Sequence, residues 1–279
     1  MPPQGGAILL AGAAVPFASM KKARIDAVLA QRGLFPSRTA AASAVRAGEV
    51  RLGQDGPIAL RPSQLVEPSA TLILDEGQRF VSRGGIKLEN ALEKLGIDVA
   101  GRDCLDVGAS TGGFTDCLLQ RGAERVVAAD VAYGQIAMQL REDPRVTVIE
   151  RLNARELAPE NLPFVPSLAT VDVSFISLKK VLPPIVSCLS PGGETLAMVK
   201  PQFELGRDRV GKGVVRDAGD RREAILGVAQ AARELGQPVR GFASSGLPGP
   251  KGNRETFVWL GGMGPEVEDL EAAVAEADE

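Results

Sequence analysis

The sequence contains no histidine, which removes the most common general base and metal ligand from the chain. A Ser-His-Asp or Cys-His catalytic group therefore cannot form. Cysteine is also scarce: Cys104, Cys117 and Cys188 show no C-x-x-C spacing, so we expect no metal site. Three thiols without a pairing pattern fit a reducing compartment, and we predict a cytoplasmic protein.

Long hydrophobic runs are missing from the N-terminal region. The apolar stretch over residues 7–17 is too short to span a bilayer, and no basic residue precedes it as in a secretory signal. We interpret residues 1–20 as a disordered extension and expect no association with a membrane.

Positive charge is missing from the C-terminus, where seven acidic residues and no basic one follow Gly261. We expect residues 263–279 to be an acidic tail, in the form of a solvated helix or a frayed end. Residues 21–82, in contrast, carry nine Lys or Arg against six Asp or Glu, a net of +3. The overall charge of −3 argues against a nucleic-acid partner, but this distribution leaves a basic N-terminal region.

The most informative stretch covers residues 105–115, with the sequence L-D-V-G-A-S-T-G-G-F-T. An apolar strand runs here into a glycine-rich turn and then into a helix. Gly108 and Gly112 lack the side chains that would keep the backbone away from a ligand. The free N–H groups at the start of the helix favour a polar or anionic ligand, so we expect a nucleotide-like molecule at this turn.

Three ligand chemistries could use this turn. A dinucleotide site would need G-x-G-x-x-G, but Ser110 occupies the second glycine position. Residues 108–112 fit the G-x-S-x-G turn of hydrolases, which needs the histidine that is missing. Methyltransferases that use S-adenosylmethionine carry an acidic residue on the strand before the glycines, as Asp106 is here. A strand-to-helix turn without any ligand is the fourth interpretation at this point.

The 279 residues are enough for two domains with real cores, and strands alternate with helices after the turn. We predict strands at residues 125–131, 146–149, 168–173, 195–199 and 257–260. Such alternation builds a doubly wound, mostly parallel sheet that binds ligands at the carboxyl ends of its strands. Asp130, Asp172 and Lys200 fall at such ends, and Asp130 is placed to accept hydrogen bonds from ribose hydroxyls. Residues 202–217 are expected to form a mobile active-site loop.

The N-terminal region contains two short helical patterns, over residues 24–29 and 39–47, and strands at residues 50–52 and 71–74 around a turn at 55–56. Three arginines on the second helix and the following strand could form one surface that binds phosphates, or simply a solvated charged face. They are Arg38, Arg46 and Arg51.

Residues 22–74 resemble an S4 RNA-binding module, a compact domain that reads the RNA backbone. The motifs that carry the resemblance are Arg-Ile-Asp from position 24, Leu-Phe-Pro-Ser-Arg from position 34 and Arg-Ala-Gly-Glu-Val from position 46. The resemblance implies that residues 21–79 form a small α+β RNA-binding domain whose RNA contacts include Arg24, Arg38, Arg46 and Arg51. We expect residues 80–85 to be a linker that hinges at its glycine pair.

Four charged residues match in order the Lys-Asp-Lys-Glu set of FtsJ-like RNA ribose 2′-O-methyltransferases: Lys87, Asp172, Lys200 and Glu255. They lie in the strings Val-Ser-Arg-Gly-Gly-Ile-Lys-Leu from position 81, Asp-Val-Ser-Phe from position 172, Val-Lys-Pro-Gln-Phe-Glu from position 199 and just before the last predicted strand. With the S4-like module in front, the chain from about residue 21 to 260 resembles the TlyA family.

The resemblance implies an α/β fold whose residues 86–262 form a Rossmann-like class I methyltransferase domain with S-adenosylmethionine as cofactor. It also implies methylation of the cytidine ribose 2′-hydroxyl in ribosomal RNA of the large subunit, and in some members also of the small subunit. The implied partners are ribosomal RNA and ribosomal subunits, and we expect a monomer. The alternatives are an inactive RNA-binding factor and a secreted hemolysin, a label that members of this family also carry.

A ribose hydroxyl is a weak nucleophile, so a base must take its proton as the methyl group is transferred. Without histidine, Lys200 is the natural base; burial and a second cation such as Lys87 would favour its neutral form, while Asp172 orients it. We expect Glu255 to hold Lys87 or the ribose. The cofactor-binding residues that we predict are Asp106, Gly108, Ala109, Ser110, Thr111, Gly112, Asp130, Asn153 and Asp172. Asn153 stands where related enzymes carry an acidic residue.

Overall fold

The computed structural model describes residues 22–35, 37–48, 50–53, 56–59, 61–74, 79–211, 213–249 and 252–278. The chain divides into two compact units between Arg83 and Gly84. The expectations for residues 1–20 and for Asp55 lie outside the described residues.

The N-terminal unit combines two helices with two small antiparallel sheets. Its elements are β1 (Ala23–Arg24), α1 (Ile25–Gln31), α2 (Arg38–Ala47), β2 (Val50–Leu52), β3 (Leu65–Val66) and β4 (Leu72–Leu74). Strands β2 and β4 pair with Val50 opposite Leu74, as the sequence predicted. The pairing of β1 with β3 was not predicted, because two-residue strands are too short to show an alternating pattern. Ile25, Leu29 and Val45 have no exposed surface and form the centre of this unit's core.

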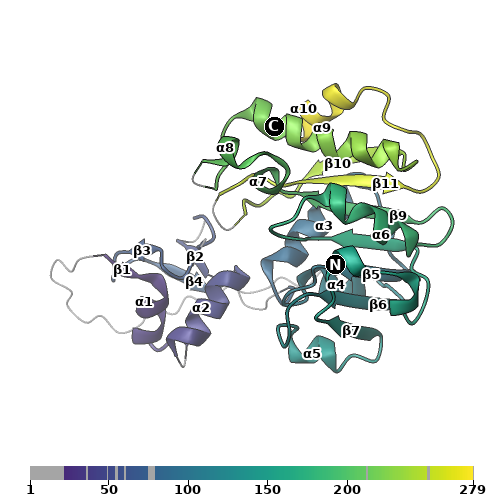
Figure 1. Ribbon diagram of the computed structural model, residues 1–279. Helices are drawn as coiled ribbons and strands as arrows, with labels where there is room; N and C mark the ends of the chain where they lie inside the picture. The colour runs from purple at the N-terminus through teal and green to yellow at the C-terminus, as the bar shows by residue number, and fades with distance from the viewer. Residues whose placement is uncertain are drawn as a thin grey trace, which may run out of the picture. The chain divides into compact units, whose positions relative to one another are not determined.

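The C-terminal unit is built on a seven-stranded sheet in the order β10-β11-β9-β8-β5-β6-β7 (Figure 1). The strands are β5 (Asp103–Val107), β6 (Arg125–Asp130), β7 (Val146–Glu150), β8 (Leu168–Val171), β9 (Glu194–Val199), β10 (Val239–Ser244) and β11 (Thr256–Gly261). The five strands from β5 to β9 are parallel, and β11 is antiparallel to both of its neighbours. The predicted doubly wound, mostly parallel sheet is therefore confirmed.

Helices cover both faces of this sheet. They are α3 (Arg83–Leu95), α4 (Gly113–Gln120), α5 (Met138–Arg141), α6 (Leu182–Ser187), α7 (Pro201–Glu204), α8 (Arg207–Val210), α9 (Ala218–Glu234) and α10 (Leu270–Ala277), with 3-10 turns η1 (Ala154–Glu156), η2 (Pro159–Asn161) and η3 (Leu178–Lys180). On one face, α6, α9 and α10 enclose a core that includes Ile185, Val228 and Val258. On the other face, the ring of Phe114 in α4 lies 5.8 Å from that of Phe257 in β11.

Two local predictions were wrong, and one strand was not predicted. Helix α3 begins at Arg83, so Gly84 and Gly85, which we expected to form a hinge, belong to its first turn. The linker is therefore shorter than the predicted residues 80–85. The segment predicted as a mobile loop over residues 202–217 contains the short helices α7 and α8, and the first of them follows directly after β9 and Lys200. Lys212 lies outside the described residues. Strand β10 was not predicted because Arg240 and Gly241 interrupt its apolar pattern.

The C-terminal segment forms a helix, one of the two expected forms, but this helix is not solvated on all sides. Leu270 and Val274 lie one helical turn apart in α10 and are buried against the core. The carboxylate of Asp278 accepts two hydrogen bonds of 2.7 Å from the guanidinium of Arg221 in α9. An apolar stripe and one buried ion pair thus fix this acidic helix to the sheet.

Within the part of the chain that the structure describes, every helix is too short or too polar to traverse a lipid bilayer. Cys104, Cys117 and Cys188 are buried and form no disulfide. Burial raises the pKa of the Cys104 thiol to about 12, which keeps it in the unreactive protonated form.

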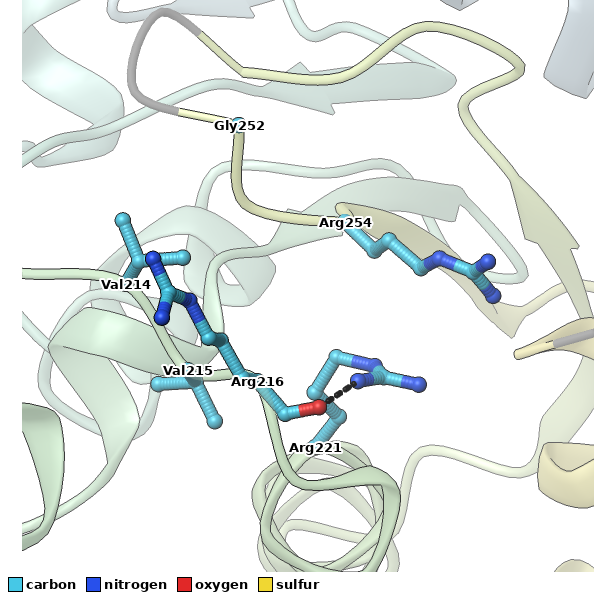
Figure 2. A pocket seen from close by; sticks show the side chains of 6 residues that line it. All are labelled: Val214, Val215, Arg216, Arg221, Gly252 and Arg254. Carbon is cyan, nitrogen blue, oxygen red and sulfur yellow. Dashed lines mark hydrogen bonds between the residues drawn. The ribbon is translucent and has the colours of Figure 1, made fainter.

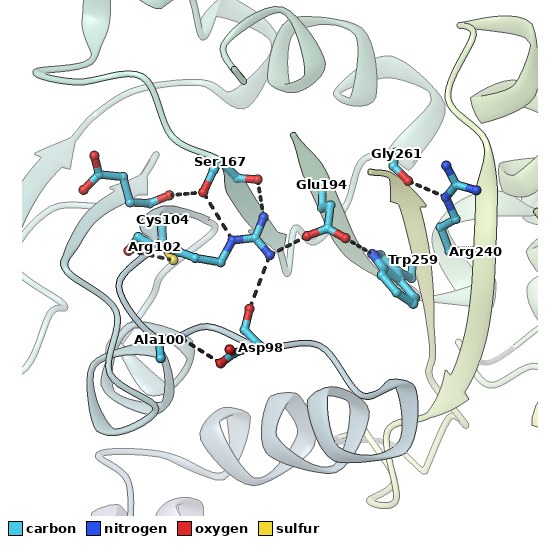
Figure 3. A network of polar contacts seen from close by, with 10 residues as sticks. Asp98, Ala100, Arg102, Cys104, Ser167, Glu194, Arg240, Trp259 and Gly261 are labelled. Atoms are coloured by element: carbon cyan, nitrogen blue, oxygen red, sulfur yellow. Dashed lines mark hydrogen bonds and ion pairs between the residues drawn. The ribbon is translucent and has the colours of Figure 1, made fainter. Parts of the chain in front are cut away.

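A polar network joins several strands at the edge of the sheet opposite the carboxyl ends of the parallel strands (Figure 3). The guanidinium of Arg102 forms an ion pair with Glu194 and donates to Ser167 Oγ at 3.2 Å and to the Ser167 carbonyl at 2.5 Å. The indole of Trp259 donates to Glu194 at 3.1 Å. Glu194, at the start of β9, therefore connects Arg102, which precedes β5, with Trp259 of β11.

We predict that Glu194→Gln lowers the free energy of unfolding by about 1–3 kcal/mol, because the partly buried Arg102 guanidinium loses its charged partner. Asp103→Asn is the matched control, since its partner Arg125 is 47% exposed and such surface pairs contribute less than about 1 kcal/mol. Urea unfolding followed by circular dichroism measures both. Equal losses in the two variants would contradict the role of this network.

Candidate active site

The glycine-rich turn joins the carboxyl ends of β5 and β6. The backbone N–H groups of Gly108 and Ala109 both donate to the carbonyl of Ala129, at 2.8 and 3.2 Å. At the end of β6, the carboxylate of Asp130 accepts 2.7 Å hydrogen bonds from the N–H groups of Ser110 and Ala132. Because a carboxylate has about four acceptor positions, Asp130 is held in place and still has acceptor capacity for hydroxyl groups.

Gly108 also lies against the loop that follows β8. A Cβ atom at this position would stand 2.5 Å from the carbonyl oxygen of Asp172, which only glycine avoids. The N–H of Asp172 donates in turn to the carbonyl of Val107 at 2.9 Å. The turn after β5 and the residue that follows β8 are therefore in direct backbone contact.

We predict that Gly108→Ala destabilises the protein more than Gly101→Ala and weakens cofactor binding. Both glycines have a positive φ, +86° and +68°, which costs a substituted residue about 1–2 kcal/mol. A Cβ atom at Gly101 meets nothing within 4 Å, whereas one at Gly108 must displace the backbone of Asp172. Urea unfolding and calorimetric titration with S-adenosylmethionine measure the two effects. Equal stability and affinity in the two variants would contradict this account.

Asp106 differs from its predicted role. Its side chain has no exposed surface, and its carboxyl accepts hydrogen bonds from Thr115 Oγ1 at 2.7 Å and from Thr170 Oγ1 at 3.3 Å. The sequence suggested that Asp106 reaches the amino group of the cofactor, directly or through water; because α4 and β8 cover its carboxyl group, Asp106 is not exposed for a direct contact. Burial raises the pKa of the Asp106 carboxyl from 3.8 to about 7, and the two threonine hydroxyls offset only part of this effect.

This raised pKa predicts a pH-dependent stability. Between about pH 4 and 7, the folded protein retains a proton on Asp106 that the unfolded chain releases, so the free energy of unfolding falls as pH rises, by up to about 1.4 kcal/mol per unit. Asp106→Asn cannot titrate, and its stability should lack this contribution. Urea unfolding of both proteins from pH 4.5 to 7.5 measures the difference. Parallel pH profiles would contradict the raised pKa.

Two ion pairs, each with a buried lysine, lie at the carboxyl edge of the parallel strands; the Asp172 side chain in one of them is 26% exposed. Lys200 directly follows β9, and its Nζ atom forms an ion pair with Asp172 and donates to Ser174 Oγ at 3.0 Å. Lys87 of α3 forms an ion pair with Glu255. Both lysines are only 8% exposed. Each buried ammonium group thus has a carboxylate partner, and the site buries no net charge.

The strand register explains why these residues meet. Strands β9 and β11 run antiparallel with Val199 opposite Thr256, so the positions beyond that pair, Lys200 and Glu255, also face each other. Strand β8 runs parallel to β9 on its other side and ends just before Asp172. The four residues of the predicted Lys-Asp-Lys-Glu set therefore come to one edge of the sheet.

Lys87 forms the ion pair with Glu255 that the sequence suggested, so the positive charge that it would add beside Lys200 is matched. It also lies inside the buried face of α3 together with Glu89, whose partner is Arg121 at 3.1 Å. Charge pairing across the fold, which a helical pattern cannot show, is what allows both groups to be buried.

A carboxylate that the sequence analysis missed holds the loop beside Lys200. Glu204 of α7 accepts hydrogen bonds from Ser177 Oγ at 2.6 Å and from the Leu178 N–H at 2.8 Å. Burial raises the pKa of Glu204, and these two bonds oppose the change.

The loop that Glu204 holds also carries Phe175, which is 91% exposed with a φ of +64°. Its ring lies 5.1 Å from the ring of Phe203. An exposed aromatic ring in a strained conformation suits contact with a ligand.

The remaining predicted cofactor residues lie on the glycine-rich turn or at the start of η1. Ser110 and Thr111 are exposed on the turn, Ala109 is buried, and Gly112 is the residue before α4 with a φ of +96°. Asn153 caps η1, since its side-chain oxygen accepts the N–H of Arg155 at 3.1 Å.

The predicted RNA-binding arginines belong to the N-terminal unit. Arg24 and Arg38 both pair with the buried carboxylate of Asp26, at 2.7 and 3.5 Å. The hydrogen bonds from Arg24 lower the pKa of Asp26. Arg51 donates to the Gly56 carbonyl at 3.4 Å, and the side chain of Arg46 lies outside the described residues. Asp26 thus brings two of the four arginines together.

The sequence profile of the FtsJ-like methyltransferase family matches residues 80–262, which is more than half of the chain. The chain belongs to the FtsJ-like methyltransferase family. The matched range contains the glycine-rich turn and both ion pairs, so the resemblance predicted from the sequence is confirmed at the level of the family.

Relatives of this FtsJ-like chain align over most of its length. It is 51% identical over 243 residues to the 16S/23S rRNA (cytidine-2′-O)-methyltransferase TlyA of Mycobacterium tuberculosis, covering 86% of this chain and 90% of that protein. Hemolysin A of Brachyspira hyodysenteriae is 36% identical over 234 residues, covering 83% and 97%. The solved structure of a proposed hemolysin from Streptococcus thermophilus has a TM-score of 0.71 at 38% identity, covering 93% and 96%.

Proposed function

We propose that this protein transfers a methyl group from S-adenosylmethionine to the ribose 2′-hydroxyl of a cytidine in ribosomal RNA, in the cytoplasm. The observation that carries the proposal is the pair of buried Lys–carboxylate contacts beside a glycine-rich turn, in a chain of the FtsJ-like methyltransferase family. The name of the Mycobacterium tuberculosis relative supplies the substrate class and includes RNA of both subunits.

The residues of the turn fit the cofactor. The Gly108 backbone leaves a space that a Cβ atom would fill, and Asp130 stands fixed at the end of β6 with acceptor capacity for the two ribose hydroxyls. Residues 108–112 would hold the methionine end, and Asn153 would lie toward the adenine. When bound, S-adenosylmethionine supplies an electrophilic methyl group next to the carboxyl edge of the sheet.

In this proposal Lys200 takes the proton of the 2′-hydroxyl as the neutral amine, after its ammonium group has released one proton to solvent. Asp172 and Ser174 fix its Nζ atom from the loop after β8, so the amine is oriented before the RNA arrives. Lys87 and Glu255 form a neutral pair on the adjacent strand end and position the ribose. Since both lysines are largely buried, few water molecules reach their amino groups.

The N-terminal unit is the RNA-docking domain in this proposal, over residues 21–79, with the methyltransferase domain continuing from residue 86. Its arginines Arg24, Arg38, Arg46 and Arg51 bind the RNA backbone. Phe175 offers a solvent-facing ring on which the target base can stack, a contact that tolerates any base.

We expect Lys200→Ala to reduce the rate of methyl transfer by at least about 100-fold, since a positioned base contributes roughly 10²–10⁴ to such a step. Affinity for S-adenosylmethionine should stay close to that of the parent, because Lys200 holds no cofactor contact in this proposal. Lys94→Ala, an exposed lysine on α3, is the control and should retain the parent rate. Transfer by Lys200→Ala close to the parent rate would remove Lys200 from the base role.

The function itself is tested by incubating unmodified ribosomal subunits with labelled S-adenosylmethionine and mapping ribose methylation by primer extension. Label at a cytidine 2′-hydroxyl of one or both subunits is the expected result and also identifies the subunit. Cofactor binding by calorimetry without methylation of either subunit would instead support an RNA-binding factor that lacks the activity.

A further inference from the structure

The loop between β8 and η3, residues 172–177, lies against the segment after β9, residues 200–204. Near the start of this loop, Ser174 Oγ accepts a hydrogen bond from Lys200 Nζ at 3.0 Å. At the other end of the loop, the carboxylate of Glu204 accepts two hydrogen bonds. Lys200 and Glu204 therefore bind the two ends of one loop from a single short stretch of chain.

The hydrogen bonds of Glu204 require a carboxylate. One oxygen accepts the hydroxyl proton of Ser177 at 2.6 Å, and the other accepts the N–H of Leu178 at 2.8 Å. Ser177 Oγ itself accepts the N–H of Lys179 at 3.2 Å, so its single proton points at Glu204. An amide at this position has one acceptor oxygen and would satisfy only one of the two donors.

Glu204 is partly buried and, unlike Asp172 and Glu255, forms no ion pair with a described residue. Burial raises the pKa of Glu204, while its two hydrogen bonds and the charge of Lys179 act in the opposite direction. Carboxylates whose surroundings disfavour their charge cluster at functional sites. Since no countercharge offsets this burial, the two hydrogen bonds are what hold the carboxylate and the loop together.

Phe175 lies in the middle of this loop with a φ of +64°, a conformation that any residue with a Cβ atom disfavours. Contacts on both sides must therefore hold it. On one side, the N–H of Asp172 donates to the Val107 carbonyl at 2.9 Å, and on the other side Glu204 binds the end of the loop. Without Glu204, the second half of the loop is free to relax, and the side chains of Ser174 and Phe175 move with it.

The chain that leaves the sheet at Lys200 is fixed again before α9, where Val215 and Arg216 line a cavity of about 310 Å³ (Figure 2). The N–H of Val215 donates to the buried side chain of Asn253 at 2.9 Å. Arg221 donates to the Arg216 carbonyl at 2.7 Å, the dashed line in Figure 2. These bonds involve neither Glu204 nor the loop after β8, so they remain when Glu204 is replaced.

We propose that Glu204 is a positioning residue for methyl transfer. By binding the end of the loop after β8, it keeps Ser174 Oγ on the Lys200 amine and the Phe175 ring toward solvent, where the target base approaches. This inference rests on the proposed function, in which Lys200 is the base. Glu204 itself touches neither the cofactor nor the RNA and acts through the loop that it holds.

Glu204→Ala tests this role in the full chain with ribosomal subunits as substrate. We expect kcat to fall about 10–100-fold, the scale of a misplaced catalytic group. The KM for the RNA should rise severalfold, because Phe175 loses its fixed conformation. The Kd for S-adenosylmethionine should stay unchanged, since Asp172 still contacts the turn at Gly108. Glu204→Gln, which keeps one acceptor, should recover part of the kcat.

Asp269→Ala is the matched control for stability. Asp269 caps α10 by accepting the N–H of Ala272 at 3.0 Å, so this variant also loses a carboxylate cap, but one without contact to either lysine. Its kcat and KM should equal those of the parent at a temperature where all variants are folded. A kcat of Glu204→Ala equal to that of Asp269→Ala overturns the inference.

A double mutant measures whether Glu204 acts through Ser174. The loss of kcat in Glu204→Ala with Ser174→Ala should be clearly smaller than the product of the two single losses, because both changes remove the same contact with Lys200. Losses that multiply overturn the inference. If Glu204→Ala does not fold, Glu204→Gln and Ser177→Ala each remove one of the two bonds, and an unchanged kcat in both overturns it equally.

Hydrogen exchange separates this inference from the proposed function, because it requires no methyl transfer. In Glu204→Ala, exchange over residues 173–178 should become faster, since the N–H of Leu178 loses its acceptor, while residues 105–115 stay as protected as in the parent. Methyl transfer by the parent, together with unchanged exchange and kcat in Glu204→Ala, rejects the positioning role alone. A parent protein that methylates neither ribosomal subunit rejects the proposed function, and the positioning role with it.

Discussion

The contact between the Gly108 backbone and the carbonyl of Asp172 is the constraint on which the rest of the site depends. It brings the turn after β5 against the first residue beyond β8, two strands that are neighbours in the sheet but lie about sixty positions apart in sequence. The turn that would hold the cofactor and the carboxylate that holds Lys200 are therefore parts of one rigid arrangement. Only glycine permits this separation, since any Cβ atom would overlap the Asp172 backbone.

Charge compensation is the second organising feature of the C-terminal unit. Lys87, Lys200 and Arg221 are each buried to more than nine-tenths, and each has a carboxylate partner from a distant element. Asp106 has no cationic partner and instead keeps a raised pKa beneath the turn. Burial is thus tolerated where charges are matched or where a proton is retained.

The two ends of the parallel strands carry different kinds of residues. At one edge, Arg102, Glu194 and Trp259 join β5, β9 and β11 by hydrogen bonds that serve the fold alone. At the opposite edge, the strand ends carry the lysine pairs, the glycine-rich turn and the exposed ring of Phe175. In a parallel sheet the carboxyl ends of all strands lie at the same edge, so the loops that follow them come together there.

The sequence by itself determined the sheet class, most of its strands and the identity of the charged residues, because a buried parallel strand and a glycine turn leave local signatures. It predicted that Asp172 orients Lys200 and that Glu255 holds Lys87, but not how deeply these groups are buried. The burial of Lys87, the enclosure of Asp106, the hydrogen bonds of Glu204 and the packing of α10 all depend on partners far away in the chain. Only the tertiary structure decided these, since the energy of a buried charge is set by what surrounds it in space and not by its neighbours in sequence.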